Sequence, residues 1–437
     1  MEIRKEGLDF LNECIKQICQ REQREQRDQD LFSKEGLTKI YNEVKNSINS
    51  SDNDVIHGNI LMIKSLLLHA KEGIFTNQII EIWKYILGKK DIKNSLIQIA
   101  VIETIPILAK YCKGNFILEF LNPSATYLLT YSSQSRNPKE KSLCYNTLAE
   151  IFTSLDLDSI INYIPIMMKN IEDELLQRNK PMCTETIKCL ESMTLKFQTK
   201  IADMVDLHRL IDSILINGLN QTSVNYLETL TKLEINKLSE HIQYKLLLVT
   251  SFILNGKIYP FEQKDKVDKN LIGKFQSMLL QQGGGAEFRG DESKCLAIQI
   301  LSSFNFNAFI DCLAIFVKDI VLTYLDNPIP MIRKAAAEAG CLLYIGKQSS
   351  VGQQMISKTL MYEIIEKFLS VAISDNDVDI RQTMLKSLNE NFDFYLNSPN
   401  NLRKLFLCVN DTNEKVQEYA LVILSKIIYK LLNYAHF

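Results

Sequence analysis

The sequence predicts an all-α protein, an armadillo-like α-solenoid in which antiparallel helix pairs stack into a superhelix. Its 437 residues include only 16 glycines and 9 prolines, well below the usual shares of about 7% and 5%, and sheet-rich folds need more of both. Apolar residues recur at every third or fourth position over long stretches, as in buried helices. Polar or proline-containing helix starts return at intervals of about 40 residues, which is the period of a helical repeat.

The clearest helix is predicted over residues 95–111. Apolar residues follow one another there at three or four positions, from Ile97 to Leu108, and Asn94 or Ser95 can cap the first turn. The segment is apolar nearly all round. This is expected of a helix that is covered by neighbours on both sides of a stack.

Two further helix starts place a proline near the first helical position, where its missing N–H costs nothing. They are Asn137-Pro138 and Lys180-Pro181. The interval from Asn94 to Asn137 is 43 residues, and that from Pro138 to Pro181 is also 43. One helix pair per interval predicts about eight to ten pairs along the chain.

A more specific signature marks the C-terminal third. Acidic turns there lead into helices that begin with an aliphatic residue followed by Arg or Gln, at Ile332-Arg333, Ile380-Arg381 and Val416-Gln417. An Asp in the turn and an aliphatic–Arg pair after it, repeated at this spacing, are typical of HEAT repeats. The turn Asp can accept backbone N–H groups and face the Arg of the neighbouring repeat, forming a ladder along the stack. The candidate ladder residues are Asp326, Arg333, Asp375, Asp377, Arg381 and Asp411.

The chain is therefore predicted to form a single continuous HEAT-type solenoid over residues 1–437, truncated at both ends. Residues 1–50 would hold the end of an earlier repeat and connecting helices, and 51–254 would hold repeats. A charged stretch and a run of three glycines predict a surface insertion with a Gly-rich loop at 255–292. Residues 293–437 would hold the best-defined HEAT repeats.

Three packing expectations follow from this arrangement. The small residues from Ala335 to Gly340 should let their helix approach its neighbours closely, and Trp83, which lies among isoleucines, should belong to the core. Because no polar capping repeat is evident, the terminal helices should expose apolar faces. At the C-terminal end this face would comprise Ile423, Ile427, Ile428 and Leu431.

Charge and composition exclude several classes of protein. The 50 basic and 52 acidic residues give a formal net charge of −2, so no bulk attraction to nucleic acid or an anionic membrane is expected. No apolar run approaches the ~20 residues that span a bilayer, and no apolar segment of a signal peptide follows the charged N-terminus. The ten cysteines form no CxxC pair. A reduced, intracellular protein without an integral membrane segment is predicted.

The sequence offers no constellation for catalysis. None of the five histidines forms the paired spacing of a zinc protease, and the glycines at 283–285 lack the Lys and Ser/Thr of a phosphate loop. Asp393-Phe394-Tyr395 lacks the Gly of a kinase metal-binding triplet. Arg21, Arg24 and Arg27 alternate with glutamates, which favours a solvated helix face. No catalytic, cofactor-binding or metal-binding residue and no small-molecule substrate are therefore predicted.

Particular strings resemble the N-terminal HEAT solenoid of the target-of-rapamycin (TOR) serine/threonine protein kinases. The strongest is residues 372–381, AISDNDVDIR, followed by LKSLNENFD at residues 385–393. Similar strings occur at residues 93–98 and 301–306, and residues 14–23 resemble the end of an earlier family repeat. Two positions depart from the family pattern: Asn389 replaces an Asp, and Gln417 replaces a repeat Arg.

The resemblance implies a non-catalytic scaffold arm of a TOR-like kinase that assembles proteins in nutrient and growth signalling. In that family the arm holds the regulatory subunit Raptor, contacts the second TOR protomer and, in some lineages, receives a Rheb-like GTPase. A cytoplasmic location is implied, with peripheral association at the lysosome or vacuole membrane through partners. A TOR protein continues into a kinase domain, whereas this chain stops at Phe437, which predicts a fragment without cofactors.

The alternative is an unrelated HEAT-repeat adaptor, such as a phosphatase scaffold or a nuclear transport receptor. A peptide groove of the importin-α kind uses repeated Trp and Asn ladders, and the chain has one Trp. A phosphatase scaffold has repeats of nearly constant length. The intervals here run from 36 residues, between Arg381 and Gln417, to 48, between Arg333 and Arg381.

Overall fold

The computed structural model describes residues 30–71, 73–175, 184–235, 237–257, 289–345, 358–388 and 392–434, together with Glu13, Tyr259 and Ser277. Across these residues every regular element is a helix. This confirms the predicted all-α class. The chain divides into two compact units, Met1–Asp206 and Leu207–Phe437. The sequence predictions made for residues 14–23, for Arg24 and Arg27, for the glycines at 283–285 and for Asn389 lie outside the described residues.

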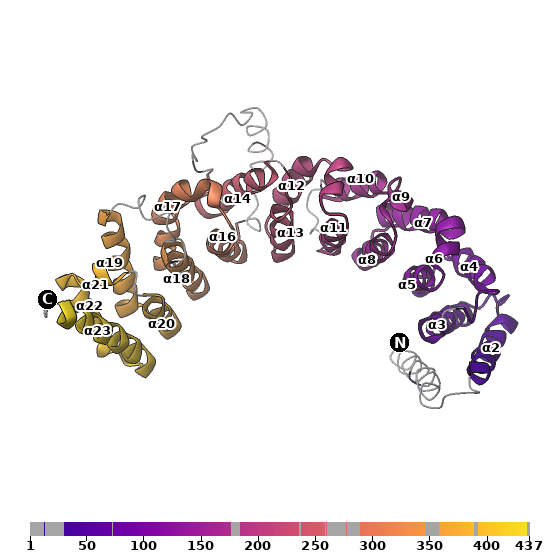
Figure 1. Ribbon diagram of the computed structural model, residues 1–437, viewed down its shortest axis with the longest axis horizontal. Coiled ribbons are helices and arrows are strands. Elements are labelled where there is room, and N and C mark those ends of the chain that lie inside the picture. Colours follow the sequence, from indigo (N-terminus) through magenta and orange to yellow (C-terminus); the bar gives the residue numbers. More distant parts are fainter. Residues whose placement is uncertain are drawn as a thin grey trace. The chain divides into compact units, whose positions relative to one another are not determined.

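The first unit consists of helix pairs arranged in two layers in chain order (Figure 1). The first helices of the pairs are α2 (Asp30–Asn46), α4 (Ile79–Gly88), α7 (Leu121–Gln134) and α10 (Ile164–Leu175). The second helices are α3 (Asn53–His69), α5 (Ser95–Tyr111), α8 (Pro138–Ser154) and α11 (Thr184–Phe197). Shorter elements are α6 (Lys113–Asn115), the π-helix η1 (Phe116–Phe120), α9 (Leu157–Ile160) and the 3-10 helix η2 (Gln198–Asp203). The second helices pack on one another in order, α3 on α5, α5 on α8 and α8 on α11.

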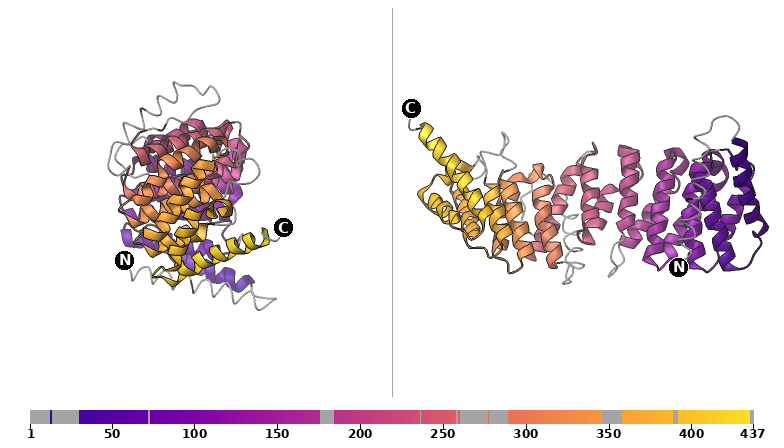
Figure 2. Two further views of the ribbon diagram at one scale, coloured as in Figure 1. Left: turned by 90° about the vertical axis from the view of Figure 1, so that its left-hand side faces the viewer. Right: turned by 90° about the horizontal axis from the view of Figure 1, so that it is seen from below.

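The second unit repeats this plan, and Figure 2 shows its helices side by side in another view. Its first helices are α12 (Leu207–Ile216), α14 (Leu238–Asn255), α17 (Ile310–Asp319), α19 (Lys358–Ser374) and α22 (Pro399–Val409). The second helices are α13 (Gln221–Thr231), α16 (Asp291–Ser303), α18 (Pro330–Ile345), α20 (Val378–Ser387) and α23 (Glu414–Tyr434). Shorter elements are the 3-10 helices η3 (Asn307–Phe309) and η4 (Val321–Asp326), and α21 (Asp393–Leu396). Here α16 packs on α18, α18 on α20 and α20 on α23.

The predicted polar helix starts are present as caps. The Asn94 side chain accepts a hydrogen bond of 3.0 Å from the Leu96 N–H, and α5 begins at Ser95 and ends at Tyr111, which confirms the helix predicted at 95–111. At α8 the Asn137 side chain accepts from the Lys139 N–H at 3.1 Å, and Pro138 occupies the first helical position. These bonds satisfy N–H groups that no helix can pair internally. The start predicted at Lys180-Pro181 lies outside the described residues.

Burial explains why the helices need their neighbours. In α14, 14 of the 18 residues are buried, and in α5 nine of 17 are. Each fully buried Leu or Ile contributes about 1.5–3 kcal/mol relative to leaving it exposed. A single helix or pair could not cover such surfaces, so stability comes from contacts with the pairs before and after.

Two core positions match the packing expectations. Trp83 is 2% exposed, and its ring lies 5.6 Å from that of Phe116 and 4.8 Å from that of Phe120, centroid to centroid. Its assignment to the core is confirmed. In α18, a Cβ added at Gly340 would lie 3.0 Å from the Phe368 ring and 3.2 Å from a Leu322 methyl group. Glycine therefore permits the close approach that the small residues predicted.

The predicted C-terminal apolar face was partly wrong. Ile423 and Ile427 are only 7% and 1% exposed, because α23 packs on both α20 and α22. Ile428 is 47% exposed, as predicted, and the side chain of Leu431 lies outside the described residues. Other large apolar side chains on α22 and α23 are exposed instead: Phe406, Leu407, Leu421, Val422 and Tyr429.

Candidate functional site

The turn residues of the second unit form two rungs between successive helix pairs. In the first rung, Arg333 donates to both carboxylate oxygens of Asp375, from Nε at 2.9 Å and from Nη2 at 3.0 Å. Its Nη1 also donates to the backbone carbonyls of Asn327 and Pro328, at 2.9 and 3.1 Å. The two side chains are 13% and 5% exposed. Such a paired, charge-assisted contact fixes both distance and orientation between repeats.

The second rung repeats this geometry one pair further along. Arg381 donates from Nε and Nη2 to the two oxygens of Asp411, each at 2.8 Å, and from Nη1 to the Asp375 carbonyl at 2.8 Å. The hydrogen bonds from Arg381 hold the pKa of Asp411 below its ordinary value, despite the opposing effect of burial. The same bonds raise the pKa of Arg381. Both side chains are thus charged and paired at neutral pH.

The rung carboxylates also organise their own turns. Asp375 accepts the Asp377 N–H at 2.8 Å, and Asp411 accepts the Asn413 N–H at 2.8 Å. Among the described hydrogen bonds, the Asp377 carboxylate accepts none from an Arg side chain. It caps α20 by accepting the Asp379 N–H at 2.9 Å. The predicted ladder set therefore contains two roles, a rung acid and a helix cap two residues later.

Asp326 lies outside the ladder, which corrects its place in the predicted set. It accepts two hydrogen bonds, of 2.7 and 2.6 Å, from Lys367 on α19, and this pair is exposed. The rung position is six residues before the Arg, and before Arg333 that position holds Asn327. Asn327 accepts the Ile329 N–H at 3.0 Å, just as the rung acids accept their turn amides. Counting back six residues from each Arg would have identified this in the sequence.

Gln417 preserves half of a rung. Its amide donates to the Asp411 carbonyl at 2.5 Å, which is the same six-residue contact that Arg333 and Arg381 make within their own turns. The Gln amide carries its N–H donors on one nitrogen, whereas the Arg guanidinium carries them on three in a fork. Gln417 therefore cannot also make the paired contact to a carboxylate. The contact within the repeat is thus retained without a bidentate contact to a carboxylate.

The first unit contains a different turn contact, which was not predicted from the sequence. Glu140, at the third position of α8, accepts hydrogen bonds from the hydroxyls of Ser95, Tyr131 and Ser135 at 2.8, 2.7 and 2.9 Å. Burial raises the pKa of Glu140, but these bonds outweigh it and leave the pKa lowered. Asn137 followed three residues later by Glu140 is a capping-box spacing. That spacing was the available signal.

Ion pairs cross the surface between neighbouring second helices. Lys64 of α3 lies 2.6 Å from Glu103 of α5, and Lys110 of α5 lies 2.9 Å from Glu150 of α8. In the second unit Lys334 of α18 lies 3.7 Å from Asp379 of α20. Each pair joins one second helix to the next. No described ion pair joins α16 to α18.

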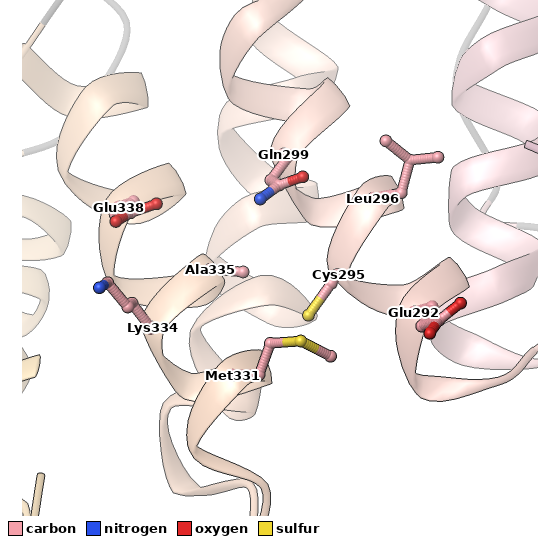
Figure 3. A pocket seen from close by; sticks show the side chains of 8 residues that line it. All are labelled: Glu292, Cys295, Leu296, Gln299, Met331, Lys334, Ala335 and Glu338. Carbon is pink, nitrogen blue, oxygen red and sulfur yellow. The ribbon is translucent and has the colours of Figure 1, made fainter. Parts of the chain in front are cut away.

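An open groove of about 360 Å³ lies between α16 and α18 (Figure 3). Cys295 and Ala335 form its floor and are 7% and 4% exposed, whereas Met331 at its edge is 50% exposed. Burial and the nearby Asp291 raise the pKa of the Cys295 thiol, so this sulfur is uncharged at neutral pH. The remaining lining residues are Glu292, Leu296, Gln299, Lys334 and Glu338.

Among the described residues, Asp212 contacts the ring of His241 at 3.3 Å and the amino group of Lys245 at 3.0 Å. No group of three or more His, Cys, Asp or Glu residues in the described part of the chain could hold a metal ion. Asp393, the acid of the kinase-like triplet, accepts a hydrogen bond of 2.6 Å from Lys430, a structural contact between α21 and α23. Among the described helices no single one is long and apolar enough to cross a membrane, although the bent pair Ser95–Tyr111 and Lys113–Gln134 passes on length and composition.

The sequence has relatives among characterised proteins over nearly its whole length. It is 27% identical to the serine/threonine-protein kinase tor1 of Schizosaccharomyces pombe over 440 residues, which is 99% of this chain and 18% of that protein. The chain is related to the TOR protein kinases. TOR of Arabidopsis thaliana is 24% identical over 98% of the chain, and TOR2 of Saccharomyces cerevisiae is 23% identical over 97%. This confirms the resemblance that the strings around residues 372–393 indicated.

The TOR-related chain spans less than a fifth of the length of these relatives. No family model matches it. Among solved structures, Kap121p bound to Ste12p aligns with 90% of the chain at 13% identity and a TM-score of 0.37, covering 44% of Kap121p. Kap121p alone aligns with 94% of the chain at 13% identity and a TM-score of 0.34.

Proposed function

We propose that this chain is a non-catalytic scaffold arm of a TOR-like kinase, whose role is to assemble proteins in nutrient and growth signalling. The observation that carries the proposal is the relationship to TOR kinases over nearly the whole chain, at a segment that folds as stacked helix pairs. Stacked repeats present long surfaces made of many side chains, which suit protein recognition better than small-molecule chemistry.

The partners proposed are a Raptor-type regulatory subunit, a second TOR protomer and, in some lineages, a Rheb-like GTPase. The support is twofold. The rungs at Arg333 and Arg381 orient successive pairs, so that side chains on the two layers keep fixed spacing. Several large apolar side chains are exposed on the neighbouring helices α22 and α23, among them Phe406, Leu421 and Tyr429. Exposed apolar groups that gather on neighbouring elements are common at interaction surfaces.

The chain is proposed to transfer no phosphate and to bind no cofactor of its own. Its place of action is proposed to be the cytoplasm, with recruitment to the lysosome or vacuole membrane through partners. Kinase activity would reside in another part of a TOR protein or in a separate chain.

The test is reconstitution with the organism's own Raptor-type subunit. The full chain and the subunit are purified, mixed at about 10 µM, and analysed by size-exclusion chromatography with light scattering and by chemical cross-linking. A stoichiometric complex with cross-links to defined helices is expected. Absence of a complex with both the Raptor-type subunit and a TOR protomer would overturn the assembly role. Transfer of γ-phosphate by the purified chain to itself or to a TOR substrate would overturn the non-catalytic assignment.

A further inference from the structure

The groove between α16 and α18 is built from two matching stripes. Its lining residues on α16 are Glu292, Cys295, Leu296 and Gln299, which share the spacing of one helical face over two turns. On α18 the stripe is Met331, Lys334, Ala335 and Glu338, with the same spacing. Both stripes therefore run for about 10 Å along parallel helix faces. Figure 3 shows Glu292 and Met331 at one end of the groove and Gln299 and Glu338 at the other.

The apolar part of the groove lies between two carboxylates. Cys295, Leu296 and Ala335 lie between its ends and Met331 lies at one end, and Glu292 and Glu338 stand at diagonally opposite ends. Among the described residues neither carboxylate has a hydrogen bond or an ion pair. Any side chain that enters between them meets an apolar floor with negative charge on both sides.

Lys334, the one basic residue that lines the groove, points toward α20 and not into the groove. The Lys334 amino group lies 3.7 Å from Asp379 on α20, and Figure 3 shows it turned away from Cys295 and Met331. In contrast, one Lys–Glu pair joins α3 to α5 and another joins α5 to α8, so the charges there are balanced. The groove between α16 and α18 thus keeps an unbalanced negative charge over an accessible apolar surface.

We propose that this groove binds an amphipathic helix of a protein partner, with Leu or Met side chains on the apolar floor and Lys or Arg residues facing Glu292 and Glu338. A helix lying along two parallel helices presents its own residues at positions i, i+3, i+4 and i+7. Basic residues at i and i+7 lie about 10 Å apart along such a helix, which is the length of each stripe. The proposal rests on the scaffold function proposed above and adds the chemistry of one partner segment.

The test uses a synthetic helix with this pattern. The probe is a fluorescein-labelled peptide of about 15 residues with Lys at i and i+7, Leu at i+3 and i+4, and Ala or Gln elsewhere. Its binding to the full chain is measured by fluorescence anisotropy at about 0.1 M salt. The Glu292→Lys/Glu338→Lys double variant is expected to bind at least about tenfold more weakly, because two attractive charges become repulsive.

The matched control is Glu234→Lys/Glu418→Lys, which makes the same change in net charge at two exposed carboxylates away from the groove. It is expected to bind within about twofold of the unmodified chain. A second probe with Ser in place of both Leu residues is expected to bind about tenfold more weakly, because it cannot use the apolar floor. Circular dichroism melting establishes that both double variants are folded before they are compared.

Several results would overturn the proposal. They are equal weakening by the two double variants, equal binding of the Leu and Ser probes, and no saturable binding of the Leu probe up to about 1 mM. If the groove fails in this way while the Raptor-type complex still forms, the groove assignment falls and the scaffold function stands. If the probe binds as expected while no complex forms, the scaffold function falls instead.

Discussion

The two units connect their helix pairs through carboxylates that are satisfied in different ways. In the first unit, Glu140 receives hydrogen bonds from the neutral hydroxyls of Ser95, Tyr131 and Ser135. In the second unit, Asp375 and Asp411 each receive two bonds from one Arg. Each acid lies near a helix start, where the helix dipole also favours a negative charge.

The difference lies in how many side chains supply the hydrogen bonds to each carboxylate. Three separate hydroxyls donate to Glu140, so the loss of one leaves two hydrogen bonds. At Asp411 a single guanidinium supplies both bonds and the opposite charge, so its loss leaves a buried, unbalanced carboxylate. Mutations in the second unit should therefore act through few residues with large effects, and those in the first unit through more residues with smaller ones.

The largest effect is expected at the second rung. Arg381→Ala should lower the free energy of unfolding by about 3 kcal/mol, because Asp411 would remain buried without its partner. Chemical denaturation of the full chain gives the magnitude, and hydrogen exchange should show the loss concentrated between α18 and α23. Arg403→Ala, at an exposed Arg on α22, is the matched control, with an expected change within about 0.5 kcal/mol. Equal effects of the two variants would show that the rung is merely solvated.

A smaller effect is expected at the hydroxyl-bonded acid. Glu140→Ala should cost about 2 kcal/mol, because three hydroxyl donors lose their acceptor while none of them carries a charge. Ser135→Ala, which removes one of the three bonds, should cost less than half as much. The comparison with Arg381→Ala would fail if the loss at Glu140 were the greater of the two.

Acid should weaken both units for the same reason. The pKa values of Glu140 and Asp411 are lowered in the folded chain. Their stabilisation is therefore complete above the ordinary carboxyl pKa of about 4 and is lost as pH falls through the lowered values. The Glu140→Gln variant has no titrating group at this position. Its denaturation midpoint should therefore fall less than that of the unmodified chain between about pH 6 and about pH 3. An unchanged pH profile would contradict the role of this carboxylate.

Two glycines give a third comparison between the units. Gly340→Ala in α18 should destabilise by about 1 kcal/mol, because a gain of about 1 kcal/mol in helix propensity is outweighed by contact with Phe368 and Leu322. Gly58→Ala in α3 places its methyl group where nothing lies within 4 Å. It should stabilise by about 0.5–1 kcal/mol. Thermal melts of both variants measure the sign, and the same sign at both positions would contradict the close approach.

The smallest effect is expected at the exposed ion pairs that both units carry between second helices. Lys110→Ala removes the contact with Glu150, whose side chain is 52% exposed. The change in unfolding free energy should stay within about 0.5 kcal/mol and shrink further at about 0.5 M salt. A loss near that of Glu140→Ala would show that the surface pairs, and not the turn contacts, connect the stack.

Several features of this protein followed from its sequence because they depend on local chemistry. The cap at Asn94, the proline at the start of α8 and the apolar face of α5 are properties of neighbouring residues, and the structure places them where the spacing predicted. The recurrence of turn acids and Arg residues likewise predicted which type of residue would meet between repeats. The strings around residues 372–393 predicted the relationship to TOR kinases.

The tertiary structure decided which partners meet. The six-residue spacing assigns the rung position to Asn327, but only packing shows that the neighbouring Asp326 pairs with Lys367 of α19. Burial of Ile423 and Ile427 depends on how α23 sits against α20 and α22. The groove between α16 and α18 unites residues about 40 positions apart, and its Lys334 pairs with Asp379 of α20. A sequence specifies helices through neighbouring residues, whereas contacts between repeats depend on distances that only the folded stack fixes.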